Sequence, residues 1–323
     1  MASFALVTLQ PPGYPHVAAF TEIRLLLFYS LCDLGHDVVL ATNRFPEGAT
    51  PIVFGAHLIS EDFPVQLPAS ALIFNTEQLM EEGSVWSKRI IGFAHQHRIW
   101  DYASANLQRL RAANSLARVH RLRLGYHREL ERVPSPRTDN EGFLFYGSIS
   151  AMREQILARI ELSERLQIQA LFGVYGWQRD GLLARCRAVL NLHAHSARLL
   201  EWPRILHLVA NAVPCIALLH PETVAEDHQL SYVLPSDEAS PTADLERWFQ
   251  VPEQLSAHAE VARERFRDQE PQHLFTAALL DQSFASGFVP ASGPVKKPGW
   301  VPCPVQHDPD PLWYQHTYYW ICD

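Results

Sequence analysis

The sequence predicts an α/β fold made of two Rossmann-like domains that face each other across a cleft. Short apolar runs of strand length alternate with helical patterns along most of the chain, as in proteins built on parallel sheets. The charged, proline-containing segment 129–141 interrupts this alternation and has the composition of an interdomain linker. Most apolar runs also end in polar residues, as expected at the carboxyl edge of a parallel sheet, where ligands bind.

Composition narrows the class of protein. The 323 residues are 47% hydrophobic and 19% charged, which is ordinary for a globular chain long enough for two domains. A net charge of -8 argues against a nucleic-acid partner. No apolar run approaches the roughly 20 residues of a membrane span, and no charged segment typical of a signal peptide opens the chain. The 5 cysteines are scattered without a Cys-x-x-Cys pair, so we expect a cytoplasmic protein without a zinc site.

The first domain is expected to cover residues 1–135. A buried strand, a Pro/Gly turn, an amphipathic helix stopped by Gly35 and a second strand form its opening βαβ unit. Its predicted strands are 4–9, 36–41, 51–58, 71–75 and 121–126, and its predicted helices are 16–34 and one that ends at Arg118. Polar residues follow the successive apolar runs and should line one crevice: His57, Asn75, Glu77, Asp101 and Asn106.

The second domain is expected to cover residues 136–286, followed by a tail at 287–323. Its predicted strands are 142–146, 168–172, 188–192, 213–219 and 231–234. Its predicted helices are 151–166, 177–187, one that begins near Pro203, 244–249, 252–266 and 272–284. The tail is rich in proline and aromatic residues, which favours packing on the body or a homo-oligomer interface over pure disorder. Its Asp308-x-Asp310 pair does not follow a core strand, so we predict no metal site there.

Two turns of the second domain suit a phosphate group. Gly147 and Ser148 lead from a strand into a helix, whose free N–H groups attract anions. Asn191, His193, Glu201 and Arg204 gather where the next strand ends and a helix begins. A guanidinium such as that of Arg204 recognises phosphate bidentately, and Glu201 would accept hydrogen bonds from ribose or sugar hydroxyls.

The stretch 188–219 resembles the donor half of GT-B glycosyltransferases. Residues 208–217 match the end of that family's pattern, E-x7-E followed by A-x-G-x-P-V, whereas Leu199 and His207 stand in place of its two glutamates. Glu201 followed by Pro203, Arg204 and Ile205 looks like a divergent bacterial branch with the signature E-x-x-R-I. The segments VFGAHL, FNTEQL, WDYASAN and LGYHREL are similar to segments of bacterial GT-B proteins, in the same order.

The resemblance implies a hexosyltransferase-like enzyme that moves a sugar from a nucleotide sugar to an acceptor hydroxyl without a cofactor or metal. The acceptor would be a glycan, a lipid-linked sugar, a peptide or a small molecule. In addition to the residues of the two turns, the resemblance assigns Gly173, Tyr175 and Ile205 to the nucleotide site. A first-domain base would deprotonate the acceptor: His16 by preference, or else Glu77.

Two other functions remain open at this stage. A non-catalytic GT-B-like module that binds a carbohydrate or a partner protein would fit the degenerate glutamate pattern and the aromatic tail. A nucleotide-sugar epimerase has the same two-domain build and would need several carboxylates and histidines around one sugar.

Overall fold

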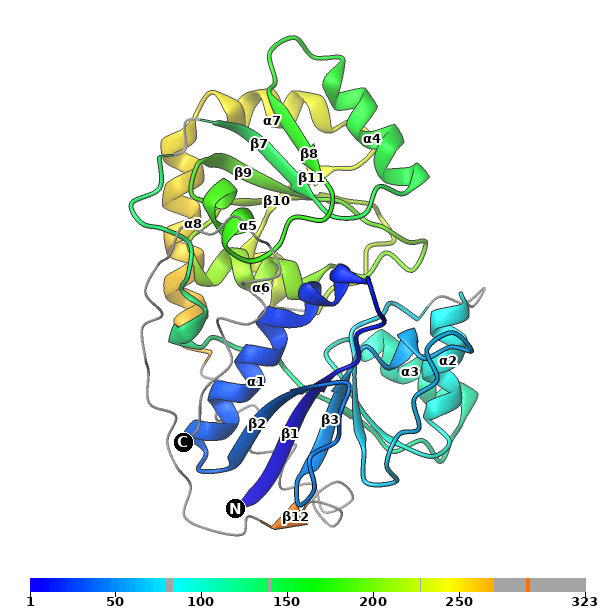
Figure 1. The fold of residues 1–323 in the computed structure, drawn as a ribbon. Coiled ribbons are helices and arrows are strands. Elements are labelled where there is room, and N and C mark those ends of the chain that lie inside the picture. The colour runs from blue at the N-terminus through cyan, green and yellow to red at the C-terminus, as the bar shows by residue number, and fades with distance from the viewer. Residues whose placement is uncertain (80–83, 139–140, 227, 270–288, 291–323) are drawn as a thin grey trace.

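The computed structural model describes residues 1–79, 84–138, 141–226, 228–269 and 289–290. Its strands form two separate sheets, each flanked by helices, which confirms the predicted two-domain α/β fold (Figure 1). The first sheet consists of β1 (Ala2–Thr8), β2 (Asp37–Thr42), β3 (Thr50–Phe54), β4 (Leu72–Asn75), β5 (Arg98–Asp101), β6 (Val119–Arg121) and β12 (Val289–Pro290). Only β12 is antiparallel to its neighbour, β1.

The second sheet is parallel throughout and has the strand order β11-β10-β9-β7-β8. Its strands are β7 (Glu141–Tyr146), β8 (Ile168–Leu171), β9 (Cys186–Asn191), β10 (Cys215–Leu219) and β11 (Leu234–Asp237). The α-helices are α1 (Thr21–Asp33), α2 (Val85–Phe93), α3 (Ser104–Ala113), α4 (Ala151–Glu161), α5 (Gly176–Leu183), α6 (Trp202–Ala210), α7 (Pro241–Phe249) and α8 (Pro252–Arg267). Among these helices none is long and apolar enough to cross a membrane.

Several elements differ from the expectation. The predicted helix 16–34 begins with a 3-10 turn at Pro15–Phe20. The predicted strand 51–58 stops at Phe54, because Gly55 adopts φ +80° and turns the chain into a short 3-10 segment. Helix α2 was not predicted. In the predicted strand 231–234, Ser231 and Tyr232 belong to a 3-10 turn, and only Leu234 belongs to a strand, as the first residue of β11.

Two expected segments lie outside the described residues: the helix 272–284, and the tail other than Val289–Pro290, which includes the Asp308-x-Asp310 pair.

The core explains why α1 lacks a polar face. Nine of its residues are buried, among them Leu25, Leu26 and Phe28, so burial is not confined to one face of the helix. Helix α1 lies between the first sheet and α6 of the second domain (Figure 1), so both of its faces are covered. A helix that is apolar all round is expected in such a position.

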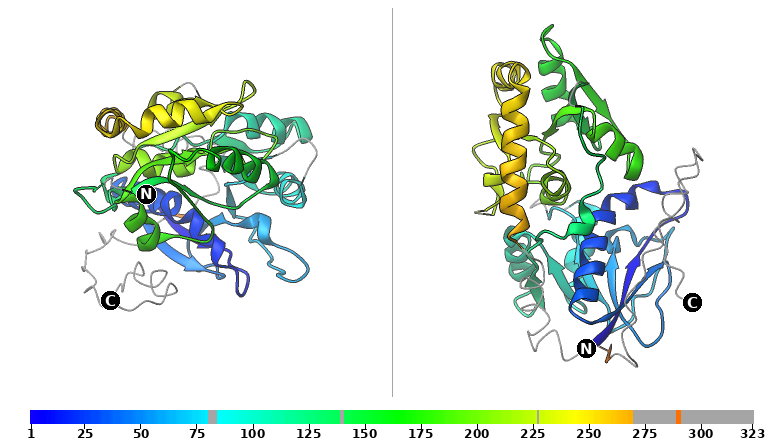
Figure 2. Two further views of the ribbon diagram at one scale, coloured as in Figure 1. Left: turned by 90° about the horizontal axis from the view of Figure 1, so that it is seen from above. Right: turned by 90° about the vertical axis from the view of Figure 1, so that its left-hand side faces the viewer.

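Helix α8 runs along the second domain and ends beside the first (Figure 2). After its last turn, the carbonyl of Gln269 accepts a hydrogen bond from the N–H of Tyr126 at 2.8 Å. Arg267 near its end pairs with Glu131 of the segment between the sheets at 2.8 Å. Helix α8 and the residues after it therefore tie the two domains together on the side of the linker.

Candidate functional site

The turn after β7 is built around Gly147. Its φ of +143° lies in the region that favours glycine. A Cβ at this position would lie 2.7 Å from Nη2 of Arg204 and 3.5 Å from Nη1 of Arg153. Glycine at this position therefore allows the guanidinium group of Arg204 to approach the backbone closely, with that of Arg153 nearby, beside the first turn of α4.

One carboxylate joins these two cations. Glu201 pairs with Arg153 through one oxygen and with Arg204 Nη2 through the other, at 2.9 Å for Arg204. Burial by itself would raise the pKa of Glu201, but the charges of Arg204 and Arg153 outweigh it and hold that pKa below its ordinary value. Both oxygens of Glu201 are thus engaged by arginines, whereas the sequence suggested that they would accept sugar hydroxyls.

The sequence analysis missed Arg153. Its side chain is 2% exposed and donates to the carbonyls of Leu192 and Ser148 as well as to Glu201. It stands in the first turn of α4, where a cation opposes the helix dipole. A cation in this unfavourable position, directly after a Gly-Ser turn, was the feature of the sequence that could have identified Arg153.

Arg204 has one nitrogen to spare. Its guanidinium lies over the rings of Tyr146 and Phe145, at 4.9 and 5.5 Å from their centroids. Within the described residues, its buried Nη1 has no hydrogen-bond partner. Arginine is well suited to phosphate, so this nitrogen is a candidate donor to an anionic ligand.

The predicted residues after β9 occupy the same edge of the sheet. Asn191 and His193 are buried, and His193 Nε2 contacts Thr223 Oγ1 at 2.8 Å. In the described part of the chain, Asn191 Nδ2 finds no partner. Burial lowers the pKa of His193, so its ring is neutral at pH 7. Unpaired polar atoms are costly to bury and are common where a ligand binds.

Ile205 differs from the other predicted site residues. Its side chain is completely buried in the core, and its N–H donates within α6 to the carbonyl of Glu201. The structure therefore gives Ile205 a packing role.

The loop after β8 reaches the first domain. Gly173 adopts φ +77° and lets the chain turn toward Tyr175, whose hydroxyl lies 2.8 Å from Nδ1 of His16. The His16 ring also packs on Phe172, with ring centroids 4.6 Å apart. The preferred base of the sequence analysis is thus in direct contact with the proposed nucleotide side.

In the first domain, the polar residues after three strands meet as predicted. His57 Nε2 lies 3.3 Å from Glu77 Oε1, and Asn75 Nδ2 donates to Asp101 Oδ2 at 2.6 Å. Asn106 Nδ2 donates to the same oxygen at 3.0 Å. Burial raises the pKa of Glu77 to about 7 and lowers that of His57 to about 3. The pair is therefore a neutral imidazole beside a carboxyl group that is half ionised near pH 7.

Asp101 is the acceptor at the centre of this network. Replacing it with asparagine is expected to lower the free energy of unfolding by about 1–3 kcal/mol, the cost of leaving buried donors unpaired. The reason is that Oδ1 also accepts from the N–H of Ala103 at 2.8 Å, so both oxygens face donors, and an amide nitrogen at either place would meet one. Urea unfolding at neutral pH measures the loss. Asp62→Asn on the exposed surface is the matched control, and an equal effect of both changes would contradict the assignment.

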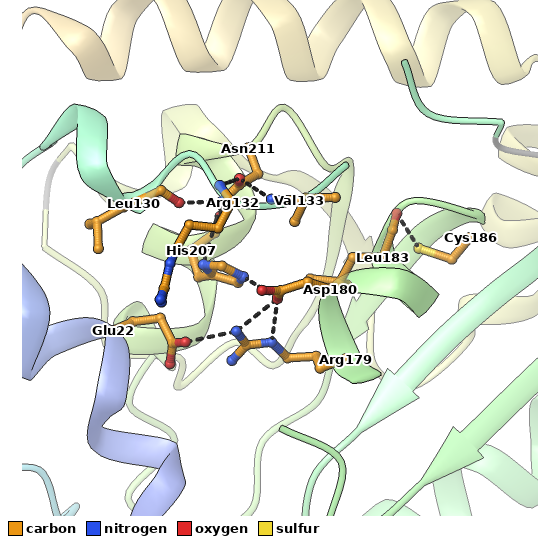
Figure 3. Close-up of polar contacts among 10 residues, drawn as sticks. All are labelled: Glu22, Leu130, Arg132, Val133, Arg179, Asp180, Leu183, Cys186, His207 and Asn211. Atoms are coloured by element: carbon orange, nitrogen blue, oxygen red, sulfur yellow. Dashed lines mark hydrogen bonds and ion pairs between the residues drawn. The ribbon is translucent and has the colours of Figure 1, made fainter. Parts of the chain in front are cut away.

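A buried charged network joins the domains behind the site (Figure 3). Arg179 of α5 donates to Glu22 of α1 at 2.7 Å and to Asp180 at 2.8 Å, and His207 of α6 lies 2.9 Å from Asp180. Asn211, after α6, accepts from the N–H groups of Arg132 and Val133 in the linker and donates to the carbonyl of Leu130. His207, which stands in place of a family glutamate, therefore belongs to the domain interface.

No group of three or more potential metal ligands occurs among the residues that the structure describes. No protein-family model and no curated protein matches the sequence.

Solved structures of glycosyltransferases match the fold. HepE from Anabaena, in complex with UDP and glucose, has a TM-score of 0.57 and 12% identity, over 85% of this chain and 99% of its own. A glycosyltransferase from Rickettsia africae has a TM-score of 0.52 and 10% identity, over 87% and 98%. WaaG, involved in lipopolysaccharide biosynthesis, has a TM-score of 0.51 and 12% identity, over 86% and 98%. The chain thus has the GT-B fold.

Proposed function

We propose that this chain transfers a sugar from a nucleotide-sugar donor to an acceptor hydroxyl, without a metal ion. The observation that carries the proposal is the close approach of the guanidinium groups of Arg204 and Arg153 to Gly147, in the turn before α4. A diphosphate placed there would meet two cations and the N-terminal turn of α4. The shared fold supports the proposal by analogy alone, because one fold can host many activities.

The main requirement for catalysis of glycosyl transfer is stabilisation of the leaving group. As the bond from the sugar to the phosphate breaks, negative charge grows on the diphosphate. Fixed donors aimed at that charge stabilise the transition state. Arg153 and Arg204 would supply them, and Asn191, His193 and Tyr175 would line the rest of the donor site.

The acceptor proton would go to a group of the first domain. His16 and Glu77 are the two candidates, because both follow strands whose ends meet the second domain. The acceptor classes are those named from the sequence: a glycan, a lipid-linked sugar, a peptide or a small molecule.

Arg204→Ala tests the donor site. The change is expected to raise the dissociation constant of a nucleoside diphosphate tenfold or more, because it removes a charge-assisted contact. Isothermal titration with UDP, GDP and ADP in the presence of EDTA measures the effect and also tests metal independence. The matched control is Arg165→Ala, since that side chain is 75% exposed on the same domain.

Equal affinity of parent and Arg204→Ala would place the nucleotide elsewhere. Binding of a nucleotide sugar without transfer or hydrolysis would favour the non-catalytic module. Conversion of the bound sugar into its epimer would favour the epimerase.

A further inference from the structure

We propose that Glu77, which lies beside the ring of His57, is the base that deprotonates the acceptor, and that His16 serves to bridge the two domains. This inference rests on the proposed glycosyl transfer and assigns its proton-accepting group.

Glu77 is partly exposed, and the next residue contacts the second domain. Its side chain is 18% exposed, whereas His57 beside it is 3% exposed. The next residue, Gln78, donates to the carbonyl of Leu199 at 3.4 Å, in the loop that leads to Glu201. The pKa of Tyr102 is raised first by burial and also by the charges of Asp101, Glu201 and Glu77. Glu77 and Glu201 thus both influence the hydroxyl group of Tyr102 electrostatically, although they belong to different domains.

The backbone of Glu77 is fixed on both sides. Its N–H donates to Asn75 Oδ1 at 3.1 Å, and its carbonyl accepts from Asn75 Nδ2 and Asn106 Nδ2, both at 2.9 Å. Asp101 holds the same two amides by accepting from each. A buried network drawn from β4, β5 and α3 is therefore arranged around a single carboxyl-bearing residue, as preorganised catalytic groups require.

His57 supplies the remaining contact. Its Nε2 lies 3.3 Å from Glu77 Oε1, and because a carboxylate can only accept, a ring that carries its proton on Nε2 would present a donor to Glu77. The rings of Phe20 and Trp86 pack against His57, and Arg89 donates to its carbonyl at 2.8 Å. Burial and the charge of Arg89 keep the pKa of His57 low, so it remains a neutral donor. A neutral donor orients the carboxylate and leaves it basic, whereas a cation would reduce its basicity.

The environment gives Glu77 the proton affinity of a base at neutral pH. The ionisable groups near it are His57, Tyr14, Tyr102 and Asp101, and its pKa is raised by burial. A general base is most effective when its pKa lies near the working pH. With a pKa of about 7, Glu77 meets that condition.

The ring of His16 is already engaged. Its Nδ1 contacts the hydroxyl of Tyr175, and its faces and edges pack with Phe172 and Tyr14. Burial raises the pKa of Tyr175 to about 12, so this hydroxyl keeps its proton at neutral pH. His16 and Tyr175 thus form a contact between the domains.

The step balances without any other reactant. The Glu77 carboxylate takes the proton of the acceptor hydroxyl while the acceptor oxygen forms a bond to the anomeric carbon. The bond from that carbon to the diphosphate oxygen breaks, and the diphosphate leaves with the electron pair. The proton passes from Glu77 to solvent after the product departs.

The test compares Glu77→Gln with the parent chain. Water serves as acceptor, so hydrolysis of UDP-glucose and other nucleotide sugars reports the step while the natural acceptor is unidentified. Glu77→Gln is expected to lower kcat by about 10²- to 10⁴-fold, the usual worth of a general base. UDP binding by titration calorimetry should remain as in the parent.

His57 is tested as a positioning residue through the pH profile. In the parent, kcat should fall as pH drops below about 7, because protonated Glu77 cannot accept a proton. His57→Leu removes the donor to the carboxylate and should move this acidic limb to higher pH, whereas His57→Gln, which can donate, should restore it. His95→Leu, at an exposed position, is the control.

If Glu77→Gln hydrolyses the donor at the rate of the parent chain, the inference is overturned. It is also overturned if the fall of kcat at low pH disappears in His16→Ala but persists in Glu77→Gln. The titration of Glu77, followed by carboxyl-carbon NMR of labelled protein, needs no activity. If Glu77 titrates with the pKa of an ordinary carboxyl group, and His57→Leu does not change that pKa, the inference is overturned even if the chain is inactive. Absence of nucleotide binding in the parent would instead refute the proposed function.

Discussion

Replacing Arg179 with methionine is expected to lower the free energy of unfolding by about 3–5 kcal/mol, the cost of removing one partner from a buried ion pair. Arg179 is 4% exposed and lies between the carboxylates of Glu22 and Asp180, at 2.7 and 2.8 Å. Methionine keeps the length of the apolar stem but supplies no charge. Within the described part of the chain, Glu22 then has no cation in contact, and Asp180 keeps only His207.

The pH dependence of this loss has a definite sign. Burial would raise the pKa of Glu22 and Asp180, but Arg179 and His207 outweigh it and lower both pKa values. Groups with a lowered pKa stabilise the fold above their ordinary pKa of about 4 and lose that contribution as pH falls through the folded value. The difference between the parent and Arg179→Met should therefore be full at pH 7 and shrink in acid.

Urea unfolding at pH 7 and at pH 4 measures both effects. Arg185→Met is the control, because its partner Glu141 is exposed and such surface pairs contribute about 0–1 kcal/mol. Small-angle scattering adds a second readout, since Glu22 and Arg179 belong to different domains. A loss no greater than that of the control would mean that the two domains do not form this contact in solution.

Glu201→Gln is expected to destabilise the chain by about 3 kcal/mol, at the lower end of the range for breaking a buried pair because Glu201 is 16% exposed. The amide keeps the shape of the side chain but leaves the guanidinium groups of Arg153 and Arg204 without a counter-charge. A diphosphate bound at Gly147 would provide one. Saturating UDP should therefore raise the melting temperature of the variant more than that of the parent.

Thermal melting of the parent and the variant, with and without UDP, checks this expectation. Glu161→Gln, an exposed residue at the end of α4, is the control for the loss of one carboxylate. If UDP stabilises the parent but leaves Glu201→Gln unchanged, the carboxylate itself contacts the nucleotide, and its bridging role would be secondary.

Local patterns in the sequence were sufficient to predict the arrangement of strands and helices in two α/β domains. The alternation of apolar strands and amphipathic helices gave both parallel sheets, since period and length are properties of short segments. Helix α2 was not predicted because its nine residues follow a polar stretch of sequence and have no long apolar stripe. The signal that was present is Ser84, whose hydroxyl accepts from the N–H of Ser87 as an N-cap.

The candidate site was predicted in part. Parallel strands end at one edge, so the polar residues after β3, β4 and β5 were expected to meet, and they do. In the second domain, Gly147, Glu201 and Arg204 lie together as expected. Arg153 was overlooked because a lone arginine in the first turn of a helix is usually a surface residue.

By itself the sequence determined the two α/β domains and the edges at which polar residues gather. Only the tertiary structure decided what each of those residues does. Glu22 and Arg179, and His16 and Tyr175, are more than 150 positions apart, and their contacts depend on how the domains pack. The ionisation of Glu77 likewise depends on burial by elements distant in the chain, because solvent exclusion, which raises its pKa, is not a property of the local sequence.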